Sequence, residues 1–138
     1  MVKFELTTIG DVLAAGFKPH EMQCAEWHDT DPATPCYAVY RDDVIIAMGS
    51  DIKMWEGRYI LWFIAGTEIK TGDWAPMLKL FSVAVASRPD IRRLEINVAC
   101  DYVAAIRMAL IIGFKLEGKM ISYMPNGGDA YLYAWVRK

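Results

Sequence analysis

Residues Tyr59–Ile64 read YILWFI, and the segments on either side of this run define the fold. The run is apolar throughout and rich in aromatic and β-branched residues, which is typical of a buried strand. The connection Ala65–Asp73 follows and carries two glycines and a lysine. Trp74–Ser87 then has apolar residues at helical spacing, and Arg88-Pro89 ends the predicted helix.

A buried strand, a glycine-containing turn and a helix N-terminus together indicate an anion site, because free backbone N–H groups there point towards a ligand. Asp73 is predicted to cap the first turn of the helix. Pro76 then lies at the third helical position, where a missing N–H costs little. The sequence therefore suggests a site at this turn without proving that it is occupied.

The composition predicts one globular domain spanning residues 1–138. The hydrophobic fraction is 54%, with five Trp, seven Tyr and five Phe, which is enough apolar surface for a core. The net charge is −2, from 15 basic and 17 acidic residues, and the sequence has no basic block. This balance argues against nucleic acid or an anionic membrane surface as the main partner.

Cysteine usage and the apolar pattern predict the compartment. Cys24, Cys36 and Cys100 are odd in number and widely spaced, so a disulfide framework or a zinc site is not expected and a reducing compartment fits. Met1–Gly10 lacks the apolar core of a signal peptide, and no apolar run reaches the ~18 residues of a membrane span. A soluble cytoplasmic protein without a metal site is expected.

Alternating apolar residues and turn signals place the remaining elements. The other predicted strands are Val2–Leu6, Cys36–Arg41, Val44–Met48, Arg93–Ala99, Phe114–Met120 and Ala130–Val136. The other predicted helices are Ile9–Ala15, His20–His28 and Tyr102–Ile112. Asp42-Asp43 is a tight-hairpin signal, and Asp51–Gly57 is interpreted as a turn.

Two of these elements carry expectations about burial. Arg93–Ala99 alternates between an apolar face and a polar face, the latter formed by Glu95 and Asn97. Tyr102–Ile112 is apolar on nearly every side, which predicts a mostly buried helix with Gly113 as its C-terminal cap.

The order of the elements predicts the fold class. Hairpins come first and strand–helix–strand units follow, which indicates an α+β fold with a mixed central sheet of about seven strands and helices on both faces. The strands before and after the central helix are expected to be parallel and joined by a right-handed crossover.

Two stretches resemble the GNAT superfamily of acetyl-CoA-dependent N-acetyltransferases. In that family an alternating strand precedes a helix that bears an Ala-Ile pair and ends in Gly-Phe eight residues further on, as at Ala105-Ile106 and Gly113-Phe114. Ile64–Leu78 is similar to the family's strand, phosphate-cradling loop and helix. Together the two stretches cover about half of the chain, and the rest agrees in element order.

The chain also departs from the family pattern. The family's loop typically reads Arg/Gln-x-x-Gly-x-Gly/Ala, whereas here Ile69 stands at the Arg/Gln, Gly72 keeps the first glycine and Trp74 replaces the second small residue. Tyr102 stands where Asn is usual, and Ala109 where many members carry a tyrosine general acid. Small internal virion or morphogenesis proteins of short-tailed phages look similar, being GNAT-like in the same C-terminal region and degenerate in the loop.

The resemblance implies a coenzyme A site in two segments. The loop residues are Lys70, Thr71, Gly72, Asp73 and Trp74, where N–H groups would bind the pyrophosphate and Lys70 would supply a nearby cation. The strand-end residues are Phe63, Ile64 and Ala65, whose backbone would pair with the pantetheine arm and hold the thioester carbonyl. The alternatives are an ordinary strand–helix turn with Trp74 packed on the core, and a plain buried strand end.

Direct acetyl transfer to an amine needs a base, or an ordered water, and an acid near the leaving thiolate. Glu56, which precedes the central strand, is the candidate base; the alternative is a solvated turn residue. Tyr102 is a candidate acid or cofactor contact, and otherwise a packing aromatic. Tyr123, in the last hairpin, is a weaker candidate. Cys100 is better interpreted as a small buried hydrophobe than as a nucleophile.

The resulting hypothesis is an acyl-CoA-dependent N-acetyltransferase whose acceptor amine, on a small molecule or a protein, is unknown. The alternative is a catalytically inactive GNAT-fold protein with a phage structural, morphogenesis or host-binding role, which would place it in a virion. A third possibility is a module that binds coenzyme A and transfers nothing. The aromatic tail Tyr131–Trp135 offers a way to pair across a homodimer.

Overall fold

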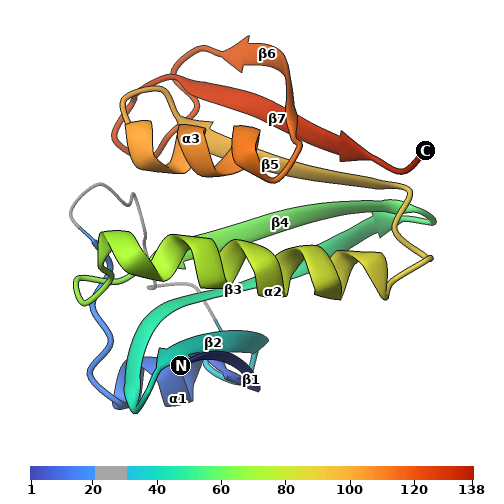
Figure 1. Ribbon diagram of the computed structural model, residues 1–138. Helices are drawn as coiled ribbons and strands as arrows, with labels where there is room; N and C mark the ends of the chain where they lie inside the picture. Colours follow the sequence, from blue (N-terminus) through green and yellow to red (C-terminus); the bar gives the residue numbers. More distant parts are fainter. Residues whose placement is uncertain (21–30) are drawn as a thin grey trace. The chain divides into compact units, whose positions relative to one another are not determined.

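The computed structural model describes residues 1–20 and 31–138 (Figure 1). Its strands are β1 (Val2–Thr8), β2 (Pro35–Arg41), β3 (Val44–Trp55), β4 (Arg58–Ala65), β5 (Arg93–Ala99), β6 (Lys115–Met120) and β7 (Ala130–Val136). Its helices are α1 (Ile9–Ala14), α2 (Trp74–Ala86) and α3 (Val103–Ile111), with a 3-10 turn, η1 (Thr71–Asp73), directly before α2. The helix predicted over His20–His28 lies, apart from His20, outside the described residues.

The seven strands form one sheet in the order β1-β2-β3-β4-β5-β7-β6. β4 and β5 run parallel, whereas β1 with β2, β2 with β3, β5 with β7 and β6 with β7 run antiparallel. The predicted α+β class and mixed seven-stranded sheet are therefore confirmed, as is the parallel pair around the central helix. Because β7 lies between β5 and β6, both of its backbone edges are paired, and a homodimer contact through Tyr131–Trp135 stays a prediction.

The chain divides into two compact units. Unit 1 comprises Met1–Ser50 and Phe63–Leu80, and unit 2 comprises Asp51–Trp62 and Phe81–Lys138. β3, β4 and α2 each contribute residues to both units. The assignment of residues 1–138 to a single domain stays a prediction.

Unit 1 is built on an apolar cluster that joins β2, β3 and the start of α2. Val39, Ile46, Ala47 and Met77 are its buried members, each at most 4% exposed, and Trp74 is among the half-buried residues that pack against it. Val39 contributes to this cluster from β2, and Phe4, its partner on β1, packs against the same cluster. The cluster therefore fixes the first turns of α2 against the strands.

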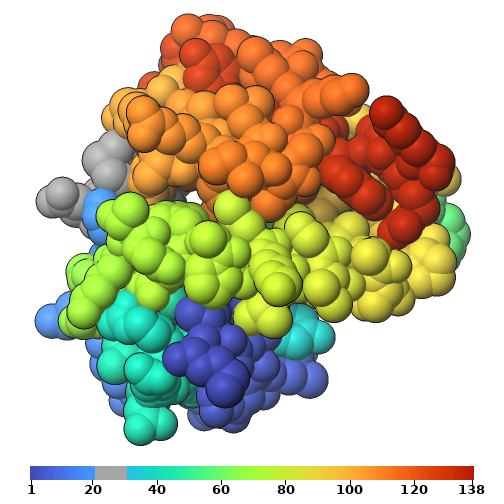
Figure 2. All heavy atoms as spheres, in the orientation of Figure 1, coloured from blue at the N-terminus to red at the C-terminus, as the bar shows by residue number. Residues whose placement is uncertain are grey.

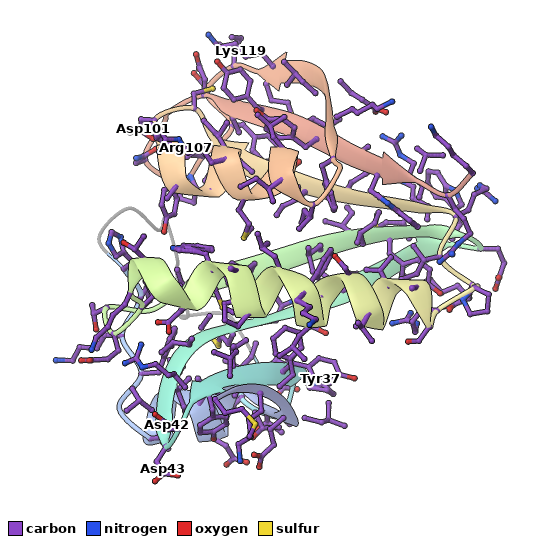
Figure 3. The ribbon with its side chains drawn as sticks, viewed as in Figure 1. Tyr37, Asp42, Asp43, Asp101, Arg107 and Lys119 are labelled. Carbon is purple, nitrogen blue, oxygen red and sulfur yellow. The ribbon has the colours of Figure 1, made fainter. Side chains whose placement is uncertain are left out.

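The hairpin between β2 and β3 turns at Asp42 and Asp43, as predicted (Figure 3). The next turn is different from the expectation, because β3 continues through Asp51 to Trp55 and the chain reverses at Glu56 and Gly57. Gly57 has a φ of 85°, a conformation that glycine adopts without strain. The interpretation of Asp51–Gly57 as a turn is therefore wrong for its first five residues.

In unit 2, α3 ends as the sequence predicts but is less buried than expected. Gly113 has a φ of 95°, and the N–H groups of Gly113 and Phe114 donate to the carbonyls of Leu110 and Ala109, which is a Schellman cap. Val103 and Ile111 are 56% and 72% exposed. The prediction of a mostly buried helix is wrong, because an all-round apolar pattern gives no direction to the face that packs.

The C-terminal end of α2 is held by Arg137. Its guanidinium donates to the backbone carbonyls of Val85, Arg88 and Ile91 at 2.9–3.0 Å. Val85 lies in the last turn of α2, and Arg88 and Ile91 lie in the connection that follows it. A cation at this position complements the negative end of the helix dipole. Residues of α2 form the yellow-green band in Figure 2. Val83 of this helix is exposed.

A network of four charges ties β4, β5 and β6 in unit 2. Glu95 is 5% exposed and accepts hydrogen bonds from both Arg58 and Arg93. Arg93 also forms a two-bond ion pair with Glu117. The predicted polar face of β5 is thus not a solvated face at Glu95, because two arginines replace the water. The hydrogen bonds from Arg58, followed by the one from Arg93, lower the pKa of Glu95.

We predict that Glu95→Gln lowers the free energy of unfolding by about 2 kcal/mol at pH 7, because it removes a buried charge that two arginines depend on. The pKa of Glu95 is lower in the folded state, so its stabilisation is complete above the unfolded pKa of roughly 4.3 and is lost as the pH falls through the folded value. Urea unfolding from pH 3 to 7 measures the difference from wild type, which should narrow below about pH 4.

Glu117→Gln is the matched control, because it removes the more exposed carboxylate, 39% accessible, from the same Arg93. An exposed ion pair contributes less than about 1 kcal/mol, so this variant should unfold close to wild type. Equal losses from the two substitutions, or a Glu95→Gln difference that does not change with pH, would contradict the assignment.

Candidate functional site

The predicted loop follows β4 as a turn of defined geometry within unit 1. The N–H of Ile69 donates to the carbonyl of Gly66 at 3.2 Å, and the N–H of Asp73 donates to the carbonyl of Lys70 at 2.9 Å. These two bonds wind the chain into η1, which leads directly into α2. All five predicted loop residues, from Lys70 to Trp74, therefore lie together.

Asp73 does not face outward as a helix cap. Its side chain is 6% exposed, and its Oδ2 accepts from the N–H of Lys70 at 2.8 Å and from the guanidinium of Arg41 at 2.5 Å. The prediction that Asp73 caps the first turn of α2 is corrected here, since its carboxylate accepts from the N–H of Lys70, at the start of η1, and from Arg41. The predicted contact of the loop N–H groups with a cofactor stays a prediction. The sequence reasoning missed Arg41, for which the available signal was its position two residues after the inward-facing Val39.

The outer side of the turn is open at Gly72. A Cβ built on Gly72 meets no atom within 4 Å, and Lys70, Thr71 and Gly72 are all exposed. The backbone N–H groups of Thr71 and Gly72 donate no hydrogen bond to another residue in ranges 1–20 and 31–138. Two N–H groups of exposed residues beside an exposed lysine are a chemically suitable environment for a phosphate group.

Trp74 packs on the inner side of the turn. Its ring lies 6.2 Å from that of Phe63, centroid to centroid, and it contacts the apolar cluster of unit 1. None of its atoms comes within 4 Å of the position that a Cβ on Gly72 would take. The indole is therefore a core residue, and it does not cover the open side of Gly72.

The end of β4 behaves differently from its beginning. The parallel ladder with β5 joins the first three residues of β4, Arg58–Ile60, to Arg93–Glu95. Phe63 and Ile64 are half-buried and Ala65 is buried. The carbonyl of Ala65 accepts from the N–H of His20 at 2.8 Å. One of the backbone groups assigned to the pantetheine arm thus already has a partner that the sequence did not reveal.

The candidate base, Glu56, lies in the turn between β3 and β4. Its side chain is 87% exposed and forms an ion pair with Lys53 at 2.5 Å. This turn precedes β4, whereas the loop with Gly72 follows it. The exposure agrees with the alternative interpretation of Glu56 as a solvated turn residue.

The two tyrosine candidates have different environments in unit 2. Tyr102 is 6% exposed and directly precedes α3, and burial raises the pKa of its hydroxyl. A raised pKa keeps the proton on the hydroxyl at neutral pH. Tyr123 is 51% exposed, and its hydroxyl accepts from the side-chain amide of Asn97 on β5 at 3.0 Å. Tyr102 is thus the better protected proton donor.

Three other positions can be placed. Ala109, at the position of the tyrosine acid in many family members, is fully buried. Cys100 is half-buried, not buried as predicted. Burial raises the pKa of the Cys36 thiol, so this cysteine is an unreactive core residue.

The chain resembles known proteins in structure but not in sequence. No protein-family model matches the sequence. No curated protein sequence matches it either. Among the described residues, no helix is long and apolar enough to cross a membrane.

Several solved acetyltransferases have a similar structure. An IAA acetyltransferase from Bacillus cereus has a TM-score of 0.74 at 14% identity, covering 99% of this chain and 100% of that one. A mutant of the spermidine N-acetyltransferase SpeG from Vibrio cholerae has a TM-score of 0.72 at 14% identity, covering 98% and 93%. An N-acetyltransferase from Staphylococcus aureus has a TM-score of 0.68 at 11% identity, covering 99% and 97%. The chain therefore has the fold of the GNAT acetyltransferases.

Proposed function

We propose that this protein is an acyl-CoA-dependent N-acetyltransferase. The observation that carries the proposal is the open turn at Gly72, between β4 and α2, where the sequence resemblance predicts a phosphate-cradling loop. The N–H groups of Thr71 and Gly72 would bind the pyrophosphate, and the ammonium of Lys70 would balance its charge. Trp74 supports the turn from the core side.

The end of β4 would hold the reactive part of the cofactor. The backbone of Phe63 and Ile64, beyond the ladder with β5, would run along the pantetheine arm and polarise the thioester carbonyl. In the reaction, the nitrogen of an amine forms a bond to this carbonyl carbon while the carbon–sulfur bond breaks. Tyr102 would donate its proton to the departing thiolate.

Removal of the proton from the acceptor ammonium is proposed to use an ordered water. Glu56, the carboxylate predicted as base, lies in the turn before β4, at the opposite end of the strand from Phe63 and Ile64, and its side chain is in solvent. Tyr123, held by Asn97, is the second hydroxyl available as an acid. Most of the rate enhancement would come from positioning the two substrates, which needs no strongly shifted base.

The acceptor is proposed to be an amine on a small molecule or a protein, and the working environment the cytoplasm. SpeG, one of the similar structures, is a spermidine acetyltransferase, but this likeness at 14% identity does not extend to the acceptor. A homodimer remains part of the proposal. The aromatic tail Tyr131–Trp135 is the segment proposed to pair across it, through side chains, because both backbone edges of β7 are occupied.

A second candidate function is a catalytically inactive GNAT-fold protein with a phage structural or host-binding role. Two observations favour it: Ala109 is fully buried at the position of the usual acid, and Trp74 fills part of the core at the position of a small loop residue. In this case the open turn at Gly72 would be a surface feature without a ligand. The following experiment separates the two functions.

We predict that acetyl-CoA raises the melting temperature by several degrees. A ligand present at ~100 times its dissociation constant adds roughly 2.7 kcal/mol to stability, which is measurable by differential scanning fluorimetry. Free coenzyme A should produce a similar rise if the pyrophosphate provides most of the binding. The absence of a rise with both ligands would reject the enzyme and favour the structural role.

We predict that Gly72→Glu abolishes this rise, because its side chain would place a negative charge on the open side of the turn. Gly118→Glu on β6 is the matched control, since a Cβ on Gly118 also meets no atom within 4 Å. The control should keep the ligand-dependent rise. If the two variants respond equally, the cofactor does not bind at this turn.

We predict that Tyr102→Phe lowers kcat about 10²-fold, the lower range for loss of a general acid, in an assay of thiol release with an acceptor amine. Tyr123→Phe should change kcat less, because its hydroxyl is exposed and already bonded to Asn97. Tyr133→Phe is the control, as this tyrosine is also buried in unit 2 with a pKa that burial raises. A larger loss from Tyr123→Phe would transfer the role of acid to Tyr123.

A further inference from the structure

We propose that Arg41 is a positioning residue for coenzyme A. It holds the carboxylate of Asp73 inside unit 1 and neutralises it, so that the outer side of the turn presents N–H donors and Lys70 to the pyrophosphate. This inference rests on the proposed function. It assigns a role to a residue on β2, far in sequence from the loop that it shapes.

The first step is the register between β2 and the start of α2. Val39 and Arg41 are two residues apart on β2, so they face the same side of the strand about 6.6 Å apart. Met77 packs in the cluster of Val39, and Asp73 lies four residues, or about one helical turn of 5.4 Å, before Met77. β2 therefore contacts the start of α2 and the turn before it in two places: Val39 with the cluster of Met77, and Arg41 with Asp73.

The second step is the set of contacts at the charged point. The guanidinium of Arg41 donates to Asp73 Oδ2 at 2.5 Å and to the carbonyl of Glu68 at 3.4 Å. The same Oδ2 accepts from the N–H of Lys70 at 2.8 Å. Arg41 thus contacts the connection both before and at the end of the turn, and Asp73 closes the turn between these contacts.

The third step is the effect of this pair on the ligand side. A carboxylate next to Gly72 is unfavourable in a loop that binds a phosphate group, because like charges at such a distance repel. The carboxylate is 6% exposed and paired with Arg41, and the ion pair as a whole has no net charge. Without Arg41, a buried unpaired carboxylate would turn towards water, which is the side that the pyrophosphate would occupy.

The test compares Arg41→Met, Asp73→Asn and the double variant. Arg41→Met keeps the length of the side chain but removes its charge, and the double variant then removes the carboxylate that was left alone. Isothermal titration with acetyl-CoA measures the affinity, and steady-state kinetics separate KM from kcat. Exchange of the Lys70 amide hydrogen, whose acceptor is Asp73, reports the geometry of the turn without any ligand.

Arg41→Met is expected to weaken acetyl-CoA binding about tenfold, to raise KM with kcat unchanged, and to speed exchange of the Lys70 amide. The double variant should return to within about threefold of wild type, because the repelling charge is gone. Lys3→Met is the control for loss of one positive charge in unit 1, since Lys3 stacks over the ring of Tyr40 and has no contact with the turn. Its affinity for acetyl-CoA should equal that of wild type.

Two outcomes would overturn the inference while the proposed function stands. Either Arg41→Met binds acetyl-CoA as tightly as wild type, or the double variant binds as weakly as Arg41→Met. If Arg41 had a purely structural role, Arg41→Met would lose stability without a change in KM, which would also overturn the inference. If wild type itself does not bind acetyl-CoA, the proposed function fails first, and the role of Arg41 in cofactor binding is rejected with it.

Discussion

A carboxylate that is removed from water needs a cation beside it, and this requirement organises both units of the protein. Within ranges 1–20 and 31–138, the buried charged side chains are Asp73 and Glu95. Each is paired with arginine: Asp73 with Arg41 in unit 1, and Glu95 with Arg58 and Arg93 in unit 2. The apolar cores leave considerable freedom in register, whereas a buried ion pair tolerates little displacement of either partner.

The two pairs have different consequences. Glu95 lies opposite Ile60 at the last pair of the ladder between β4 and β5, so its arginines fix the strands where they are already hydrogen-bonded. Asp73 lies in a connection without strand pairing, where its contacts determine the path of the backbone. The same electrostatic requirement therefore stabilises a sheet in one unit and shapes a candidate binding loop in the other.

Local patterns in the sequence predicted most helices and strands, but they could not predict contacts between residues far apart in the sequence. The strand Arg93–Ala99 and the cap at Gly113 follow from alternation and from glycine chemistry within a few residues. The turn predicted over Asp51–Gly57 failed because its polar composition outweighed the period-two alternation that continues β3. The Arg41–Asp73 pair joins residues 32 apart, so no local pattern contains it, and the inward position of the carboxylate was missed for that reason.

At the candidate site, the residue types alone do not show which side chains face the ligand. A glycine-rich signature for a phosphate loop records where side chains must be absent, because backbone N–H groups contact the ligand. Trp74 breaks that signature, yet its indole packs with Phe63 on the core side and leaves the space beside Gly72 open. The size of a residue matters to the ligand only when its side chain faces the ligand. The tryptophan at position 74 is therefore weak evidence against cofactor binding, although it is much larger than the residue usual in the family. The negative charge of Asp73 is the greater obstacle to phosphate binding, and the fold neutralises it with Arg41.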